Sequence, residues 1–220
     1  GPPANPTATA NPMPYPGASM PTEWPDEKRA AADLKMALAK MVDQQGSVDE
    51  AIANYEKMLE VDPQNLLLIR RLAVLHDKKG HPDQAEPHYQ KALRMTPKDA
   101  SLLCDYGYHC YLQRRWSDAE MNLRRSLELD SHQSRARGNL GLVLARTQRV
   151  DEAIREFTEA GCSRADAHAN VAFALASESQ IEFAEQQYRQ ALQVDPQHKR
   201  AREALAALDQ ARKQSATKQG

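Results

Sequence analysis

Two cysteines and a histidine, Cys104, His109 and Cys110, form the densest group of chemically reactive side chains in the sequence. Thiolates and imidazoles bind zinc and act as nucleophiles or bases, so a metal or thiol site is the first chemistry to consider. In a helix, however, Cys104 and His109 do not share a face, and His109 and Cys110 point roughly 100° apart. We therefore expect these side chains to pack between helices, as we do for His76 and His88, and we predict no metal site.

The usual catalytic motifs are also missing from the sequence. It contains no glycine-rich phosphate loop, His-Glu-x-x-His, Cys-x-x-Cys or Gly-x-Ser-x-Gly. The third cysteine, Cys162, falls in a short turn, where exposure would make its thiol reactive. We predict that the chain has no catalytic residues, binds no cofactor and is not an enzyme.

The charge balance bears on the choice of partner. The 220 residues include 29 basic and 30 acidic side chains, a formal net charge of −1, so no net field attracts nucleic acid or anionic lipid. No stretch approaches the roughly 18 apolar residues that span a bilayer. The three cysteines are few and odd in number, whereas a disulfide framework has many cysteines in pairs. These features predict a protein or peptide as the partner, with no nucleic acid and no direct membrane span.

The N-terminal residues 1–25 differ in composition from the rest. They are rich in Pro, Ala, Thr and Asn and carry almost no charge, so they cannot bury enough apolar area to offset the entropy of ordering. We predict a disordered tether here, and a second disordered segment at residues 214–220. Gly1-Pro2 is what a cleaved tag leaves behind. The sequence therefore leaves open whether a signal, a lipid anchor or a membrane tether precedes these residues in the natural protein. A tether of this kind favours a periplasmic or membrane-anchored lipoprotein over a cytoplasmic protein.

Residues 26–213 have the texture of helices. Ala, Leu, Glu, Gln, Lys and Arg dominate, and apolar residues recur at steps of three and four. Regular breaks such as Asp62-Pro63, Gly80 and Thr96-Pro97 divide the segment into helices of about 12 to 16 residues.

These helices repeat. The segment Asp49–Pro63 returns 34 residues later as Asp83–Pro97, and again near residues 118, 151 and 182. Every copy carries a small residue followed four positions later by a large one. The pairs are Ala51 and Tyr55, Ala85 and Tyr89, Ala119 and Leu123, Ala153 and Phe157, and Ala184 and Tyr188.

Five such pairs in register closely resemble the tetratricopeptide repeat (TPR) family, whose 34-residue unit is an antiparallel pair of helices. The resemblance implies an all-α, right-handed α-solenoid of about five TPR hairpins plus a C-terminal capping helix. The expected repeats are 32–65, 66–99, 100–133, 134–164 and 165–198, followed by a cap at 197–213. The fourth repeat is three residues short, which should alter the step between the last two hairpins.

The resemblance also implies where a partner binds, because the first helix of each TPR hairpin lines the concave wall. At equivalent positions we expect an apolar row of Val74, Tyr108, Leu142 and Phe173. Asn139 and Asn170 resemble the asparagine ladder by which some relatives hold an extended peptide. The alternative left open is that the aromatic side chains only seal neighbouring helices while the asparagines are solvated. The full predicted groove is Arg70, Arg71, Val74, Tyr108, Tyr111, Arg135, Asn139, Leu142, Arg146, Asn170 and Phe173.

The predicted function is therefore a protein–protein interaction scaffold that binds a peptide or partner protein in this groove. A looser resemblance to the TPR lipoproteins of pilus and secretion assembly, including tight-adherence systems, suggests a role in a bacterial envelope or pilus/secretion complex. The alternative is a regulatory or targeting domain of a larger enzyme or multiprotein complex. The residues that grip chaperone tails in some relatives are not at the matching positions, so that partner is not expected.

Overall fold

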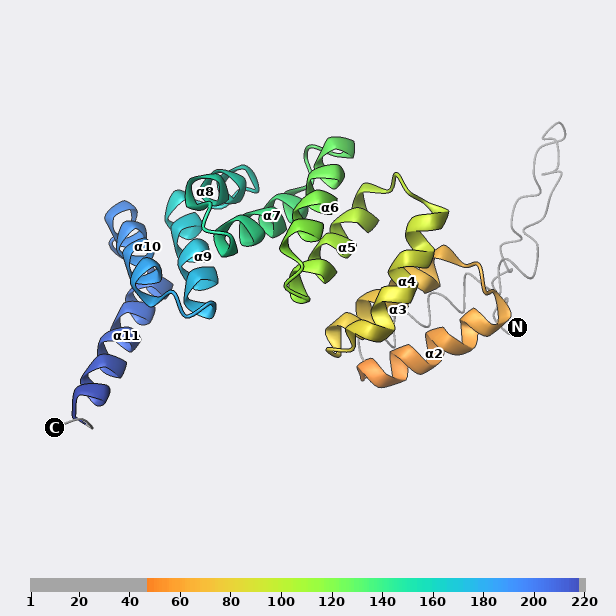
Figure 1. The fold of residues 1–220 in the computed structure, drawn as a ribbon, viewed down its shortest axis with the longest axis horizontal. Coiled ribbons are helices and arrows are strands. Elements are labelled where there is room, and N and C mark those ends of the chain that lie inside the picture. Colours follow the sequence, from red (N-terminus) through yellow and green to blue (C-terminus); the bar gives the residue numbers. More distant parts are fainter. Residues whose placement is uncertain (1–46, 218–220) are drawn as a thin grey trace, which may run out of the picture. The chain divides into compact units, whose positions relative to one another are not determined.

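The computed structural model describes residues 47–217, and every regular element within that range is a helix (Figure 1). The predicted tether, the first helix of the first repeat and residues 218–220 lie outside the described residues. The helices are α2 (Val48–Val61), α3 (Leu66–Lys78), α4 (Pro82–Met95), α5 (Ala100–Leu112), α6 (Trp116–Leu129), α7 (Ser134–Arg146), α8 (Val150–Glu159), α9 (Arg164–Ser177), α10 (Ile181–Val194) and α11 (Lys199–Thr217). None of the described helices is long and apolar enough to cross a membrane.

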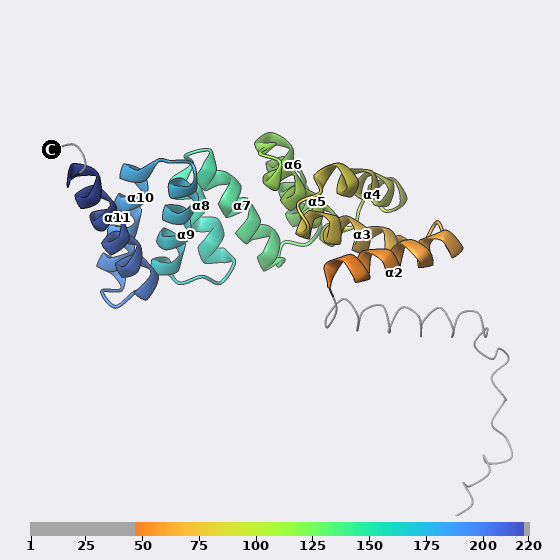
Figure 2. The same cartoon turned by 90° about the horizontal axis from the view of Figure 1, so that it is seen from below.

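Consecutive helices pair into hairpins, as the repeat pattern predicts. Helix α3 packs on α4, α5 on α6, α7 on α8 and α9 on α10, while α11 packs on α10 (Figures 1 and 2). Helix α2 is the second helix of the first repeat and packs on α3. The described part of the chain is thus an all-α solenoid of helical hairpins followed by one further helix.

Side chains at the repeat boundaries start several of the helices. Ser47 and Glu50 form a reciprocal capping box at the start of α2. Asn65, Asp99 and Ser163 each accept a hydrogen bond from a backbone N–H in the first turn of α3, α5 and α9. These caps satisfy donors that would otherwise have no partner inside the helix.

The turn within each hairpin repeats the same backbone conformation. One residue adopts a positive φ, and the next N–H donates to the carbonyl five residues earlier at 2.8–3.0 Å, the bond of a Schellman motif. The positive-φ residues are Gly80 (73°), Arg114 (59°), Gln148 (63°) and Ser179 (59°). Only the first of these is a glycine, so the other hairpin turns carry a residue type that resists this conformation.

The fourth repeat ends early. Helix α8 has 10 residues where α4, α6 and α10 each have 14. Gly161 takes a φ of 102°, and the Cys162 N–H donates to the Phe157 carbonyl at 3.0 Å, which terminates the helix.

The last helix is longer than predicted. Helix α11 runs to Thr217, past the predicted end at Lys213, because none of its last residues breaks a helix.

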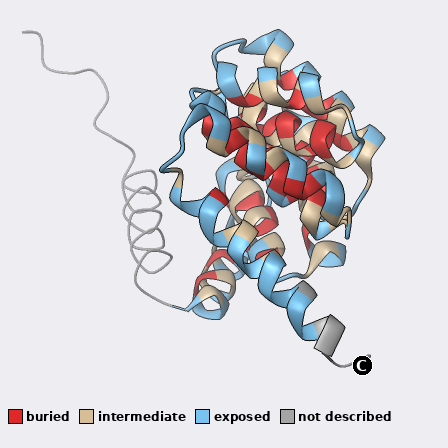
Figure 3. Cartoon of the chain, turned by 90° about the vertical axis from the view of Figure 1, so that its left-hand side faces the viewer, coloured by how far each residue is buried: buried red, intermediate tan, exposed pale blue. Residues whose placement is uncertain are grey.

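The core is built from the small and large residues that the repeat pattern singled out. All five alanines are at most 1% exposed, and the five large partners are at most 5% exposed. Figure 3 shows the buried residues in red along the helices. Two glycines make the closest approaches. A Cβ at Gly107 would lie 2.7 Å from Leu123 Cγ, and one at Gly141 would lie 3.0 Å from the Phe157 ring. The second helix of each of these hairpins can therefore press directly on the backbone of the first.

Candidate functional site

A cavity of about 560 Å³ opens across three successive first helices, α3, α5 and α7. We call it the groove. It is lined by Val74, Asp77, Lys78, Tyr89, Asp105, Tyr108, Leu112, Arg135, Asn139 and Leu142. Five of the predicted contact residues are among these: Val74, Tyr108, Arg135, Asn139 and Leu142.

The middle of the groove is apolar. Val74, Tyr108 and Leu142 occupy equivalent positions 34 residues apart, so they form a row across the three helices. Tyr108 is 39% exposed and Leu112, one turn further along α5, is 41% exposed. Because burying such side chains is favourable, this row offers a binding surface for an apolar group of a ligand.

Asn139 supplies a polar group beside the row. Its side-chain amide donates to Cys104 Sγ at 3.7 Å, and its Oδ1 accepts no hydrogen bond from any described residue. That oxygen is free to accept a backbone N–H of an extended peptide.

Asn170 does not line the groove, where the second asparagine of the predicted ladder would lie. Its amide donates to Cys162 Sγ at 3.7 Å, and its oxygen accepts from Arg200 of α11 at 2.8 Å. It lies outside the groove and links the short turn to the last helix. Phe173 is 60% exposed on α9, but it also lies beyond the residues that line the cavity.

Tyr111 and Arg146 belong to an interlock between hairpins and not to the groove. Tyr111 is 9% exposed, and its hydroxyl accepts from Arg146 Nε at 3.1 Å. The Arg146 guanidinium also lies 5.3 Å from the Tyr111 ring, 5.8 Å from the Trp116 ring, and pairs with Glu178. The periodicity placed both residues near the concave side, but contacts between successive repeats cover them.

The two arginines predicted on α3 mainly contact other residues of this chain and not the groove. Arg70 donates to Asp99 at 2.8 Å and to Asp105 at 3.4 Å, and its side chain is 25% exposed. Arg71 is half-buried and does not line the groove. Of the predicted arginines, only Arg135 lines the cavity with an exposed side chain.

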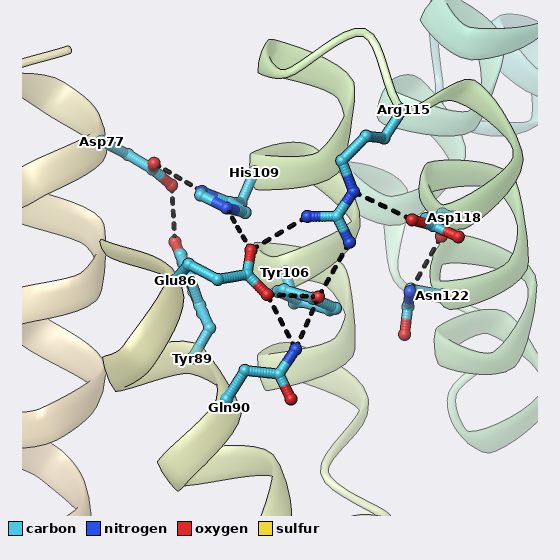
Figure 4. Close-up of polar contacts among 9 residues, drawn as sticks. All are labelled: Asp77, Glu86, Tyr89, Gln90, Tyr106, His109, Arg115, Asp118 and Asn122. Atoms are coloured by element: carbon cyan, nitrogen blue, oxygen red, sulfur yellow. Dashed lines mark hydrogen bonds and ion pairs between the residues drawn. The ribbon is translucent and has the colours of Figure 1, made fainter. Parts of the chain in front are cut away.

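A polar network centred on His109 adjoins the groove, and two of its members, Asp77 and Tyr89, also line that cavity (Figure 4). His109 is 1% exposed, and its ring nitrogens lie 2.7 Å from Asp77 Oδ1 and 2.8 Å from Glu86 Oε2. Since both nitrogens face carboxylate oxygens, both must donate, and the ring is an imidazolium. It thereby ties α5 to α3 and α4.

Further donors complete the network. Glu86 accepts from the Tyr106 hydroxyl at 2.8 Å and from Arg115 at 3.0 Å, and Asp77 accepts from the Tyr89 hydroxyl at 2.9 Å (Figure 4). Burial alone would raise the pKa of Glu86, but hydrogen bonds from Gln90, Tyr106, His109 and Arg115 outweigh it and hold that pKa at about 2. Burial lowers the pKa of His109, but its two carboxylate partners more than reverse this and raise it above 6.5.

In the sequence, His109 stands near Cys104 and Cys110, and nothing there indicates this network. The signal was available only in three dimensions, because Asp77 and Glu86 lie 32 and 23 residues away. The two cysteines are fully buried, and burial raises the pKa of both thiols, that of Cys110 to about 11. Among residues 47–217, no three His, Cys, Asp or Glu side chains gather in a way that could hold a metal ion.

The fold and its repeated turns define a helical repeat protein. Two tetratricopeptide repeat profiles match the sequence, at residues 44–107 and 111–170, which together span more than half of the chain. The chain belongs to the tetratricopeptide repeat family. Comparison with curated proteins finds no significant relative.

Solved structures with a similar fold cover most of the chain. The structure reported in a functional characterization of Pseudomonas aeruginosa pilF is 26% identical, with a TM-score of 0.61 over 87% of this chain and 90% of that one. YrrB, described as a TPR protein with an unusual peptide-binding site, is 24% identical, with a TM-score of 0.58 over 81% and 93%. A MamA protein is 21% identical, with a TM-score of 0.57 over 74% and 90%.

Proposed function

We propose that this chain is a non-catalytic scaffold that holds an extended segment of a partner protein in the groove formed by α3, α5 and α7. The observation that carries the proposal is the row of Val74, Tyr108 and Leu142 beside the open oxygen of Asn139. An apolar side chain of the ligand would cover the row while Asn139 accepts a backbone N–H.

Three further points support a peptide as the ligand. The groove crosses several helices, which suits a chain in extended conformation at about 3.3 Å per residue. YrrB, which shares the fold, is described as having a peptide-binding site. The net charge of −1 favours protein over nucleic acid as the partner.

The test is affinity capture from an extract of the source organism. The baits are the wild-type chain, a groove variant with Tyr108→Ala and Asn139→Ala, and a control variant with Met121→Ala and Phe183→Ala. The control residues are 60% and 59% exposed on α6 and α10 and lie outside the groove. Circular dichroism establishes that all three baits are folded.

We expect a partner that binds the wild type and the control but not the groove variant. A partner that binds the groove variant as well as the wild type, and is lost from the control, would place the interaction on the second helices and refute the proposal.

A narrower proposal concerns the process. We propose that the partner belongs to a bacterial envelope or pilus/secretion complex, on the basis of the sequence resemblance described above. The identity of the captured partner tests this separately, because a groove-dependent partner from an unrelated process would leave the scaffold function in place.

A further inference from the structure

The charged residues of the groove are unequally accessible. The carboxylates of Asp77 and Asp105 are only 8% and 12% exposed. In contrast, the Arg135 side chain is 60% exposed, and Lys78 is also exposed. A ligand that enters the groove therefore meets cations before it meets carboxylates.

The two carboxylates are already satisfied by the protein. Asp77 accepts from the Tyr89 hydroxyl on one oxygen and faces His109 with the other. Asp105 faces Arg135 at 2.7 Å through one oxygen and Arg70 at 3.4 Å through the other. Little of their negative charge remains to attract a basic ligand.

The two cations retain unused hydrogen-bond donors. Lys78 is exposed and forms no hydrogen bond or ion pair with another described residue, so its three N–H donors are available. Arg135 pairs with Asp105 through Nη1 and also interacts with the Cys104 thiol, which leaves part of its fork of five donors available.

The positions of these cations relative to the apolar row define a pattern. Lys78 lies four residues beyond Val74 on α3, a rise of about 6 Å, and Arg135 lies seven residues before Leu142 on α7, a rise of about 10 Å. Since Val74 and Leu142 are equivalent positions of their repeats, the cations flank the row on opposite sides.

We propose that the groove selects an extended segment in which acidic residues stand on both sides of a central apolar or aromatic residue. The inference rests on the proposed function and specifies the ligand of that same groove. The central side chain packs on Tyr108 in the middle of the row, and the acidic flanks pair with Lys78 and Arg135. Two exposed cations are too few to follow a nucleic acid backbone, so the ligand is a peptide.

The contribution of each flank follows from the exposure of the cations. An exposed ion pair strengthens binding about two- to fivefold, so both together give about four- to 25-fold at low salt. Salt screens such pairs, and the preference for acidic flanks should shrink at high ionic strength.

The test is selection from an unbiased library of short displayed peptides on the immobilised chain. A peptide counts as a groove ligand when it binds the wild type but does not bind a folded Tyr108→Ala or Leu112→Ser variant. We expect the accepted peptides to carry Asp or Glu on both sides of an apolar residue.

Charge reversal then tests the pairing directly. Lys78→Glu should weaken an accepted acidic peptide about fivefold or more at low salt, because an attraction becomes a repulsion. Arg155→Glu removes the same charge from an exposed residue of another cavity, of about 520 Å³ between α8 and α9, and should leave the affinity unchanged.

The outcomes separate this inference from the proposed function. Groove-dependent peptides with neutral or basic flanks, or equal effects of the two charge reversals, would overturn the inference while the groove remained a peptide site. A selection that yields no groove-dependent peptide at all would overturn both.

Discussion

A glycine pair on α5 and α7 gives a quantitative test of how the hairpins pack. A Cβ added at Gly107 would meet Leu123 Cγ at 2.7 Å, Leu123 Cδ2 at 3.0 Å and the Ala119 carbonyl oxygen at 3.3 Å. At Gly138, also inside a helix, an added Cβ meets nothing within 4 Å. The same substitution should therefore have opposite effects at the two positions.

The magnitudes follow from two opposing contributions. Alanine is favoured over glycine in a helix interior by about 0.5–1 kcal/mol, so Gly138→Ala should stabilise the fold by that amount. Overpacking a core costs about 1–3 kcal/mol, so Gly107→Ala should be destabilising by about 1 kcal/mol, and by at most about 2.5 kcal/mol, after the helical gain is subtracted. Urea denaturation followed by far-UV circular dichroism measures both shifts.

A third variant identifies the cause. Leu123→Ala removes the two side-chain atoms that lie within 3.0 Å of the new methyl group and leaves only the Ala119 carbonyl oxygen at 3.3 Å. In that background Gly107→Ala should therefore lose most of its penalty. If the Gly107→Ala variant has a higher denaturation midpoint than the wild type, as is expected for Gly138→Ala, the inference that Leu123 packs closely on the α5 backbone is wrong.

Three other measurements test the buried groups. The pKa of His109 is raised on folding, so its stabilisation is complete below the unfolded value of about 6.5 and is lost as the pH rises through the folded value. The loss of stability in His109→Gln, about 3 kcal/mol at pH 6, should therefore shrink at alkaline pH, and a loss independent of pH would contradict the imidazolium. A thiol reagent should modify Cys162 in the native chain much faster than Cys104 and Cys110, which are 0% exposed; three equal rates would contradict that burial. Arg146→Ala should destabilise by about 2 kcal/mol in urea melts, and an unchanged midpoint would show that the guanidinium does not join the hairpins.

Much of the fold could be predicted from the sequence because repetition multiplies a weak signal. One alanine followed by a large residue four positions later is unremarkable, but five such pairs in register specify which face of each second helix is buried. The break at Gly80 could be predicted because glycine is a typical helix-ending residue. The turns at Arg114, Gln148 and Ser179 adopt the same positive φ without a glycine to indicate it, so only their place in the repeat identifies them.

The groove was predictable in part. Helical spacing identifies which residues point toward the concave side, and it found Val74, Tyr108 and Asn139. Spacing cannot show which of those side chains a neighbouring repeat covers, and it therefore included Tyr111, which the Arg146 interlock buries. It also cannot show that a carboxylate is already satisfied, which is why the excess of accessible cations emerged only from the structure.

The most direct test of the central claim is site-specific photo-cross-linking. A photoreactive phenylalanine analogue replaces Tyr108 in the groove or Met121 on α6, both of which are solvent-accessible. After irradiation in native extract, the account predicts a cross-linked partner peptide from position 108 and none from position 121. A partner captured from position 121 and not from position 108 would contradict the groove as the binding surface.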